Sequence, residues 1–278
     1  MQKSLILLTL GYLLSGSLSA GDIAVTTTVE ISSTRIQSIS GQWKFKAGDE
    51  LFWGAAEYDD SKWNDTTVPQ RWLEQGYPET EQFAWYRLSL QLAPSTKDKW
   101  GKLGVEIGKV LSAYEIYAGG KLLGGIGGLP PNSDVNYDQT RIYSIPLSAI
   151  NSEGKLVLAL RVWGGTDFSV IRWGGGPHDG QFSIGEQVDL LERAFLDLLP
   201  ALALSILFLG FGLYHLYLYM RNTQLHGYLW YGLTALDISL YSLMSSQLRY
   251  YLSWDFISYE KIEFSAIYAL PPLLMQMI

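Results

Sequence analysis

The chain of 278 residues contains no cysteine and little charge. The lack of cysteine excludes disulfides, thiol catalysis and thiolate-bound metals. Charged residues make up 17% of the chain and hydrophobic residues 48%, whereas a soluble domain usually carries about 25% charged residues. Residues 194–278 hold only 3 of the 20 basic and 5 of the 27 acidic residues. This distribution predicts a water-soluble segment joined to a membrane segment, and it excludes a simple cytosolic globule.

Basic charge is scarce in the water-soluble segment too. Residues 21–193 carry 16 basic and 22 acidic residues, a net charge of −6. An acidic surface repels phosphate backbones, so nucleic acid is not expected as a partner. Its one histidine, His178, cannot form a transition-metal site alone, and the glycine-dense stretch 119–128 lacks the strand–turn–helix setting of a nucleotide fingerprint. No cofactor is therefore expected, and a structural calcium held by loop carboxylates stays open.

The first twenty residues have the layout of a secretory signal peptide. Lys3 supplies a short positive start, Leu5–Leu14 is an uncharged apolar run, and Gly16–Ala20 is small and flexible. We predict that residues 1–20 are a signal peptide that is cleaved after Ser19 or Ala20. The alternative is a retained membrane anchor, but ten apolar residues are too few to span a bilayer comfortably.

The C-terminal third has the pattern of membrane helices. Leu198–Met220 runs without a formal charge, and as a helix it crosses a hydrocarbon core of about 30 Å. Gly227–Leu248 contains one charge, Asp237, and Phe264–Ile278 begins a third segment that would reach only about 22 Å as a helix. The sequence therefore predicts helices over about 198–220, 227–248 and 264–278 within a membrane region 194–278. The short third helix suggests an N-terminal piece of a longer protein.

The signal peptide fixes the expected orientation. Residues 21–193 are exported, Arg221–His226 forms a cytoplasmic turn, and Arg249–Glu263 forms an external loop. Arg249 and Lys261 lie on the wrong side for the positive-inside rule. Asp237 is the one carboxylate at membrane depth, where a charge is costly, so it is expected to face the helix bundle. It is either a switch or ion site, or a polar contact between helices.

The exported segment shows the alternation of β-strands. Tyr86, Leu88, Leu90 and Leu92 alternate with polar residues, and the stretch Ser112–Tyr117 leads into a glycine turn typical of a hairpin. Short strands with glycine-rich joints predict two packed antiparallel sheets. We therefore expect an all-β sandwich over residues 21–193, followed by α-helical transmembrane segments.

Four ordered motifs in this segment carry a resemblance. They are Gly41–Phe45, Tyr58–Trp63, Val68–Trp72 and Ala84–Arg87. This order is similar to the sugar-binding jelly-roll domain of family 2 glycoside hydrolases, which has a galactose-binding-like fold. Joined to membrane helices, it also resembles bacterial seven-transmembrane receptors with diverse intracellular signalling modules. The resemblance implies a jelly roll exported across a bacterial inner membrane, a multi-pass protein and a cytoplasmic output domain outside this chain.

No catalytic residue is expected in the chain. Glycoside cleavage needs two carboxyl groups about 5 to 9.5 Å apart across the bond. Asp59 and Asp60 are adjacent, and neighbouring side chains of an extended strand point in opposite directions. Their context indicates turn and cap residues. Trp43, Trp63, Trp72 and Trp85 lie inside the fold motifs and are expected in the core, and Arg87 is expected to make a structural ion pair or backbone contact.

The segment 163–180 is the candidate ligand site. It is too glycine-rich for a regular strand, and flat aromatic faces with a few polar groups suit a sugar. The candidate residues are Trp163, Arg172, Trp173, His178 and Asp179. The alternative is that its glycines let the loop turn back over the sandwich, with tryptophan closing the sheet edge.

Three functions fit these features. The favoured hypothesis is a sensor whose jelly roll binds a small, carbohydrate-like ligand and changes the packing of helices in the lipid bilayer, with a homodimer as a candidate assembly. Gln181–Arg193 would join the two parts stiffly, because a glycine–serine tether would lose the signal. The alternatives are a membrane-anchored carbohydrate-processing enzyme with its catalytic domain outside this chain, and a binding or scaffolding protein without output.

Overall fold

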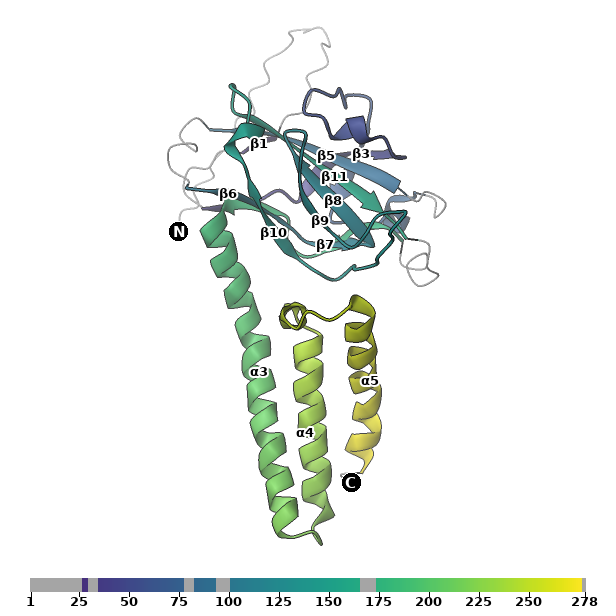
Figure 1. Ribbon diagram of the computed structural model, residues 1–278, viewed down its shortest axis with the longest axis vertical. Coiled ribbons are helices and arrows are strands. Elements are labelled where there is room, and N and C mark those ends of the chain that lie inside the picture. The colour runs from purple at the N-terminus through teal and green to yellow at the C-terminus, as the bar shows by residue number, and fades with distance from the viewer. Residues whose placement is uncertain (1–26, 30–34, 78–82, 94–100, 166–173, 277–278) are drawn as a thin grey trace, which may run out of the picture.

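The protein consists of a β-sandwich at one end of a group of three helices (Figure 1). The computed structural model describes residues 27–29, 35–77, 83–93, 101–165 and 174–276. The predicted signal peptide lies outside these residues. The sandwich occupies the described residues up to 186, and the helices follow directly from it.

The larger sheet has the strand order β4-β3-β5-β11-β8-β9, with β1 pairing parallel to β5. The bounds of its strands are β1 (Thr27–Val29), β3 (Gly41–Ala47), β4 (Asn64–Val68), β5 (Phe83–Leu92), β8 (Ala113–Ala118), β9 (Lys121–Ile126) and β11 (Lys155–Trp163). Strand β5 lies between β3 and β11, with Leu88 opposite Leu158. Such a central strand is covered on both faces, so few of its side chains reach solvent.

The smaller sheet has the order β10-β6-β13-β2, and a two-stranded sheet joins β12 to β7. Their bounds are β2 (Ile36–Ser38), β6 (Leu103–Ile107), β7 (Lys109–Leu111), β10 (Arg141–Ile145), β12 (Gly176–Asp179) and β13 (Ser183–Glu186). Three short 3-10 helices, Leu51–Gly54, Leu73–Gln75 and Leu147–Ala149, complete the connections. Apart from the β1–β5 pair, the strand pairs of the described residues are antiparallel, as the sequence predicted.

The alternation predicted for β5 separates two apolar clusters. Tyr86, Leu88, Leu90 and Leu92 belong to the main core between the sheets. On the opposite face, Trp85 packs with a small cluster formed by Trp53, Trp63 and Ala159. The face that the sequence marks as polar is thus covered as well, by the chain segment that follows β3 and contains Trp53 and Trp63.

Arg87 lies on that second face with 1% of its surface exposed. Its Nε donates to Oδ2 of Asp60 at 2.8 Å, and its Nη atoms donate to the carbonyl oxygens of Trp53, Ala55 and Tyr58. The prediction of a structural ion pair and backbone contacts is confirmed. The neighbouring Asp59 accepts a hydrogen bond from the Ser61 backbone at 3.0 Å, which agrees with the turn role expected for the two aspartates.

The tryptophans of the four motifs are buried, as predicted. Trp43, Trp63, Trp72 and Trp85 each expose 6% of their surface or less. The predicted hairpin is present as β8 and β9, which are joined by Gly119 and Gly120 at φ of 54° and 79°. Two consecutive residues with positive φ are what a tight hairpin turn requires.

The helices are α3 (Gln187–Arg221), α4 (His226–Met244) and α5 (Phe256–Met275), with a 3-10 helix η4 (Gln247–Tyr251) between the last two. The observed helix ends differ from the predicted membrane spans at three places. Helix α3 begins eleven residues before Leu198 because it continues directly from β13. Helix α4 ends at Met244, and Ser246 then caps η4 by accepting from the Leu248 backbone. Helix α5 begins at Phe256 because Asp255 caps it through the Ser258 backbone.

Helix α3 has 35 residues and is therefore about 52 Å long. Within the described part of the chain, it is the one helix both long and apolar enough to cross a membrane, with a mean hydropathy of 2.1 over its most apolar window. Only 6% of that window is buried inside the structure. This finding rests on length and composition alone, and α4 and α5 do not reach the same standard.

Helices α3 and α4 approach closely at two glycines. A Cβ atom on Gly212 would lie 2.6 Å from the Leu236 side chain, and one on Gly232 would lie 2.8 Å from Leu216. Small residues allow such close packing of apolar helices. Two hydroxyls add hydrogen bonds between the helices, from Ser239 to the Ser205 carbonyl at 2.7 Å and from Ser242 to the Ala201 carbonyl at 3.3 Å.

Asp237 is half-buried on α4, and its Oδ2 atom is buried without a hydrogen-bond partner among the residues described. The polar contacts between α3 and α4 that the structure shows come from Ser239 and Ser242 instead. The role of Asp237 as a switch stays a prediction.

We predict that Gly212→Leu separates α3 from α4, because the larger side chain overlaps Leu236 and overpacking costs about 1 to 3 kcal/mol. The absence of native cysteine allows spin labels at Leu207→Cys and Leu240→Cys, and the distance between them should increase. Gly210→Leu is the matched control, since nothing lies within 4 Å of a Cβ at Gly210. Equal distances in the two variants would contradict the prediction.

Candidate coupling site between the sandwich and the helices

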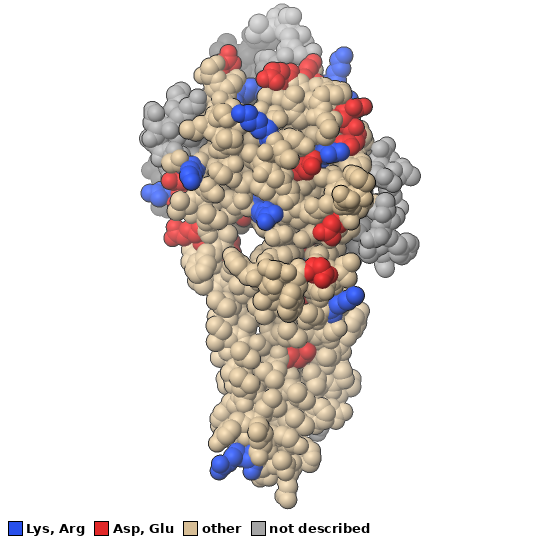
Figure 2. Space-filling view, in the orientation of Figure 1, with Lys and Arg blue, Asp and Glu red and all other residues tan. Residues whose placement is uncertain are grey.

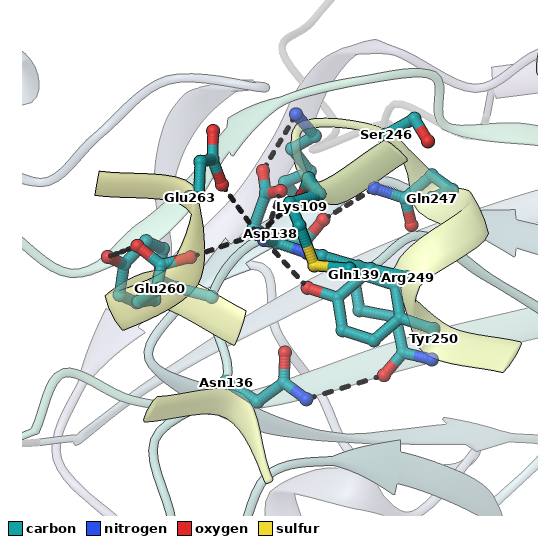
Figure 3. A network of polar contacts seen from close by, with 12 residues as sticks. Lys109, Asn136, Asp138, Gln139, Ser246, Gln247, Arg249, Tyr250, Glu260 and Glu263 are labelled. Carbon is teal, nitrogen blue, oxygen red and sulfur yellow. Dashed lines mark hydrogen bonds and ion pairs between the residues drawn. The ribbon is translucent and has the colours of Figure 1, made fainter. Parts of the chain in front are cut away.

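The chain between β9 and β10 reaches from the sandwich to the helices. Its residues Tyr137 and Asp138 contact α5 and η4, although more than 100 positions separate them in the sequence. Figure 3 shows the polar contacts that meet there, contributed by β7, the β9–β10 connection, η4 and α5. We call this set of contacts the coupling site.

Arg249 of η4 is the centre of the coupling site and is fully buried. Its Nη1 lies 2.7 Å from Oε2 of Glu263 and 3.2 Å from Oε1 of Glu260, both on α5. Its Nη2 donates to Oδ2 of Asp138 at 2.7 Å. Its Nη1 also donates to the Met244 carbonyl at 3.0 Å. The planar fork of guanidinium donors suits several acceptors at once, whereas a lysine ammonium is a compact point charge.

Asp138 is shared between two cations. Its Oδ2 accepts from Arg249, and its Oδ1 lies 2.7 Å from Nζ of Lys109 on β7. Lys109 also lies 3.3 Å from Asp179 of β12. Burial lowers the pKa of Lys109, but Asp138 and Asp179 outweigh it and hold that pKa above its usual value. Lys109 therefore stays charged, and the ion pairs run from the sandwich to α5 through Asp138.

Two further contacts fix the β9–β10 connection on the helices. Gln247 accepts from the Thr140 backbone at 3.0 Å and donates to the Asp138 carbonyl at 2.7 Å. Tyr137 bonds Glu260 through its hydroxyl at 3.1 Å, and its ring packs on Phe256 with centroids 4.7 Å apart. Burial and the nearby Glu260 carboxylate raise the pKa of Tyr137, so its hydroxyl stays protonated and can donate.

A second attachment lies at the start of α3. Arg193 pairs with Glu106 of β6, and Asp189 lies 3.3 Å from Arg35. The Gln187 backbone donates to the Lys102 carbonyl at 2.8 Å. Burial raises the pKa of Glu106 more than Arg193 lowers it. The sandwich is thus held to the helices at two places, one on α3 and one on η4 and α5.

The predicted ligand residues are distributed differently from the expected loop. Trp163 ends strand β11 and exposes 1% of its surface, so the prediction that it lies on the loop is wrong and its ring has no face free to stack on a sugar. Arg172 and Trp173 lie outside the described residues. His178 and Asp179 belong to β12, so this part of the predicted loop is a strand.

Strand β12 brings His178 and Asp179 to the coupling site. Nε2 of His178 lies 3.0 Å from the Tyr137 carbonyl, and Asp179 pairs with Lys109. The glycines of this segment allow it to cross Trp72 closely: a Cβ atom on Gly175 would lie 2.5 Å from that ring. The described residues 174–179 therefore follow the alternative prediction, in which the glycines let the segment turn back over the sandwich.

The central residues of the coupling site, Arg249, Asp138 and Gln247, were missed in the sequence. One signal was available, because the topology predicted from the sequence puts Arg249 on the side of the membrane where the positive-inside rule disfavours a positive charge. A charge in an unfavourable position indicates a specific partner. The sequence does not identify that partner, since Asp138 is 111 positions away.

Among known proteins, the matches to this chain are solved structures with a similar fold. No protein-family model matches the chain, and no curated protein sequence matches it significantly. A family 2 glycosyl hydrolase from Bacteroides cellulosilyticus is 16% identical with a TM-score of 0.43, over 55% of this chain and 20% of that one. A Bacteroides uniformis β-glucuronidase is 20% identical with a TM-score of 0.42, over 54% and 17%.

A β-glycosidase from Bacteroides vulgatus is 21% identical with a TM-score of 0.41, over 54% of this chain and 20% of that one. The matched part of this chain thus spans about a fifth of the length of these enzymes.

We predict that Arg249→Gln releases the β9–β10 connection from the helices, because three carboxylates lose their shared cation. Breaking a buried ion pair costs about 3 to 5 kcal/mol, so the Thr140 amide, which Gln247 holds, should exchange its hydrogen at least about 100-fold faster. Arg249→Lys should not restore protection. Arg221→Gln, at the exposed end of α3, is the control, and unchanged exchange in Arg249→Gln would refute the prediction.

We also predict a loss of stability on mild acidification. Burial holds the pKa of His178 below its usual value of 6.5, so the unfolded chain takes up a proton before the folded chain does. The contribution of His178 to the free energy of unfolding is complete above pH 6.5, and it is lost as the pH falls through the lower pKa of the folded state. The free energy of unfolding should drop less between pH 7.5 and 5.5 in His178→Gln than in the wild type or in the surface variant His226→Gln. An equal drop in all three would reject the assignment.

Proposed function

We propose that the chain is the sensing part of a multi-pass receptor in the bacterial inner membrane, with the sandwich on the exported side. The sandwich binds a small, carbohydrate-like ligand, and the helices carry the signal to a cytoplasmic output domain outside this chain. The observation that supports this proposal most is the buried Arg249, which holds the sandwich to η4 and α5 through Asp138. A homodimer is part of the proposal as a candidate assembly.

Signalling requires that a change in the sandwich reaches the helices. Helix α3 follows β13 at Glu186 without any linker, and the coupling site gives a second attachment. A body attached at two separate places transmits rotation, whereas a body on one flexible tether loses it. A ligand shifts such an equilibrium only through a difference in its affinity for the two states.

The membrane location is supported by the surface of the helices. Helix α3 meets the criterion for a membrane span, and its exposed residues are apolar over most of its length, among them Leu199, Leu204, Ile206, Leu207, Leu209, Phe211 and Leu213. Figure 2 shows few charges on the helices compared with the sandwich. An apolar surface of this extent needs a non-aqueous neighbour, and the bilayer supplies one. In the proposal α4 and α5 cross it as well.

The proposal gives this chain no catalytic role. A hydrolase would need a pair of carboxylates, and Asp59 and Asp60 are adjacent. Asp59 instead accepts a hydrogen bond from the Ser61 backbone, and Asp60 pairs with Arg87. The carbohydrate class of the ligand is supported by the motif order Gly41–Phe45 to Ala84–Arg87.

The test is a distance measurement on the whole chain in lipid nanodiscs. Spin labels at Met220→Cys and Met275→Cys report the spacing of the far ends of α3 and α5, which are exposed. A neutral mono- or disaccharide that binds should change this distance. At a sugar concentration high enough to saturate it, Arg249→Gln should show no change of distance, while the exposed control Lys261→Gln should show the wild-type change.

Binding without any change of distance in the wild type would overturn the signalling role. Failure of every sugar to bind the folded chain would overturn the carbohydrate class of the ligand.

A further inference from the structure

A cavity of about 560 Å³ lies where the sandwich, α3 and η4 meet. Figure 2 shows the surface hollowed at this level, between the sandwich and the helices. The sandwich contributes Glu106, Lys109 and the stretch 139–142, α3 contributes four residues from Leu191 to Leu198, and the end of α4 with η4 contributes Ser245–Gln247, Tyr250 and Tyr251. Its walls therefore belong to both parts of the protein, and its volume is in the range of small-molecule sites.

The charges around the cavity balance. Lys109 and Arg141 are positive, and Glu106 and Asp197 are negative. Lys109 and Glu106 already have partners in Asp138 and Arg193. Because positive and negative lining residues are equal in number, neither a cation nor an anion would meet an excess of opposite charge. The lining therefore favours a neutral molecule.

Several polar groups of the lining have hydrogen-bonding capacity to spare. Gln139 makes one side-chain contact, with Asn136 at the limiting distance of 3.5 Å. Arg141 is exposed, donates to the Gly125 carbonyl at 3.3 Å and also bonds the Tyr143 side chain, which leaves some of its five N–H groups for a ligand. The Ser245 hydroxyl makes no hydrogen bond with any described residue, and its side chain is exposed to the cavity. These groups come from both sides of the cavity.

The lining also offers apolar surface beside the polar groups. Ile142, Leu191 and Leu198 are among the lining residues, and so is Tyr251, which exposes 77% of its whole surface. An exposed aromatic ring next to amide, hydroxyl and guanidinium groups with spare hydrogen-bonding capacity suits a ligand with apolar C–H faces and hydroxyl edges. A neutral polyol of mono- to disaccharide size has both.

We propose that this cavity binds a neutral, polyhydroxylated ligand of mono- to disaccharide size. The proposal deepens the sensor function and rests on it for the consequence of binding. A ligand in the cavity touches β10, α3 and η4 at once, so its affinity depends on how the sandwich is docked. That dependence is the differential affinity that a shift between two states requires.

Calorimetric titration of the whole chain in nanodiscs tests the site, with glucose, maltose and cellobiose as neutral probes and glucuronate as the charged comparison. At least one neutral probe should bind, and more tightly than glucuronate. Ser245→Trp should fill the cavity and weaken binding at least about tenfold, and Gln139→Leu should weaken it several-fold by removing polar contacts. Ser265→Trp, on the exposed side of α5 in a different cavity, should leave binding unchanged.

Binding that survives both Ser245→Trp and Gln139→Leu would overturn the site and leave the sensor function standing. Loss of binding in Trp173→Ala with retention in Ser245→Trp would place the ligand on the segment 163–180 instead. Tighter binding of glucuronate would overturn the neutral class. No binding by any probe, with circular dichroism showing a folded chain, would overturn this site and the carbohydrate class together. By contrast, only the spin-label distance between positions 220 and 275 can overturn the signalling role.

Discussion

The buried guanidinium of Arg249 is the interaction on which the joining of the two parts depends. Removing such a group from water is costly, and acceptors around its donors offset that cost. Glu260, Glu263 and Asp138 supply three carboxylates, and the Met244 carbonyl supplies a fourth acceptor. Two of these carboxylates come from α5 and one from the sandwich. The Nε of Arg249 is buried without a hydrogen-bond partner among the described residues, and its two Nη atoms keep all of these acceptors only when the sandwich is docked on the helices.

The docked arrangement is stiff because its attachments are short and separate. Strand β13 passes directly into α3, and Arg193 pairs with Glu106 within two turns of that junction. The coupling site holds the opposite side through Asp138, Tyr137 and Gln247. The cavity lies between these two attachments, so a molecule inside it contacts both bodies. The electrostatic contacts and the position of the cavity thus both support the proposed mechanism, in which ligand binding and docking influence each other.

The sandwich could be predicted because its signals are local. Alternation in β5, the glycine turn at Gly119 and Gly120, and the motif tryptophans depend on neighbours in the sequence, and the structure confirms each of them. Arg87 was correctly expected to make structural contacts. The observed helix ends differ from the predicted membrane spans, because those spans followed the apolar runs alone. The real ends depend on the Ser246 and Asp255 caps and on the continuity of β13 with α3.

The sequence by itself determined the division into a charged sandwich and apolar helices, since composition and alternation depend on each residue and its near neighbours. Only the tertiary structure decided which charges meet. Lys109, Asp138 and Arg249 lie in three distant segments, and no local pattern relates them. It also decided that Trp163 is buried in β11, whereas His178 and Asp179 reach the coupling site through β12. Burial and pairing over long distances follow from how the sheets and helices pack, which a linear pattern does not contain.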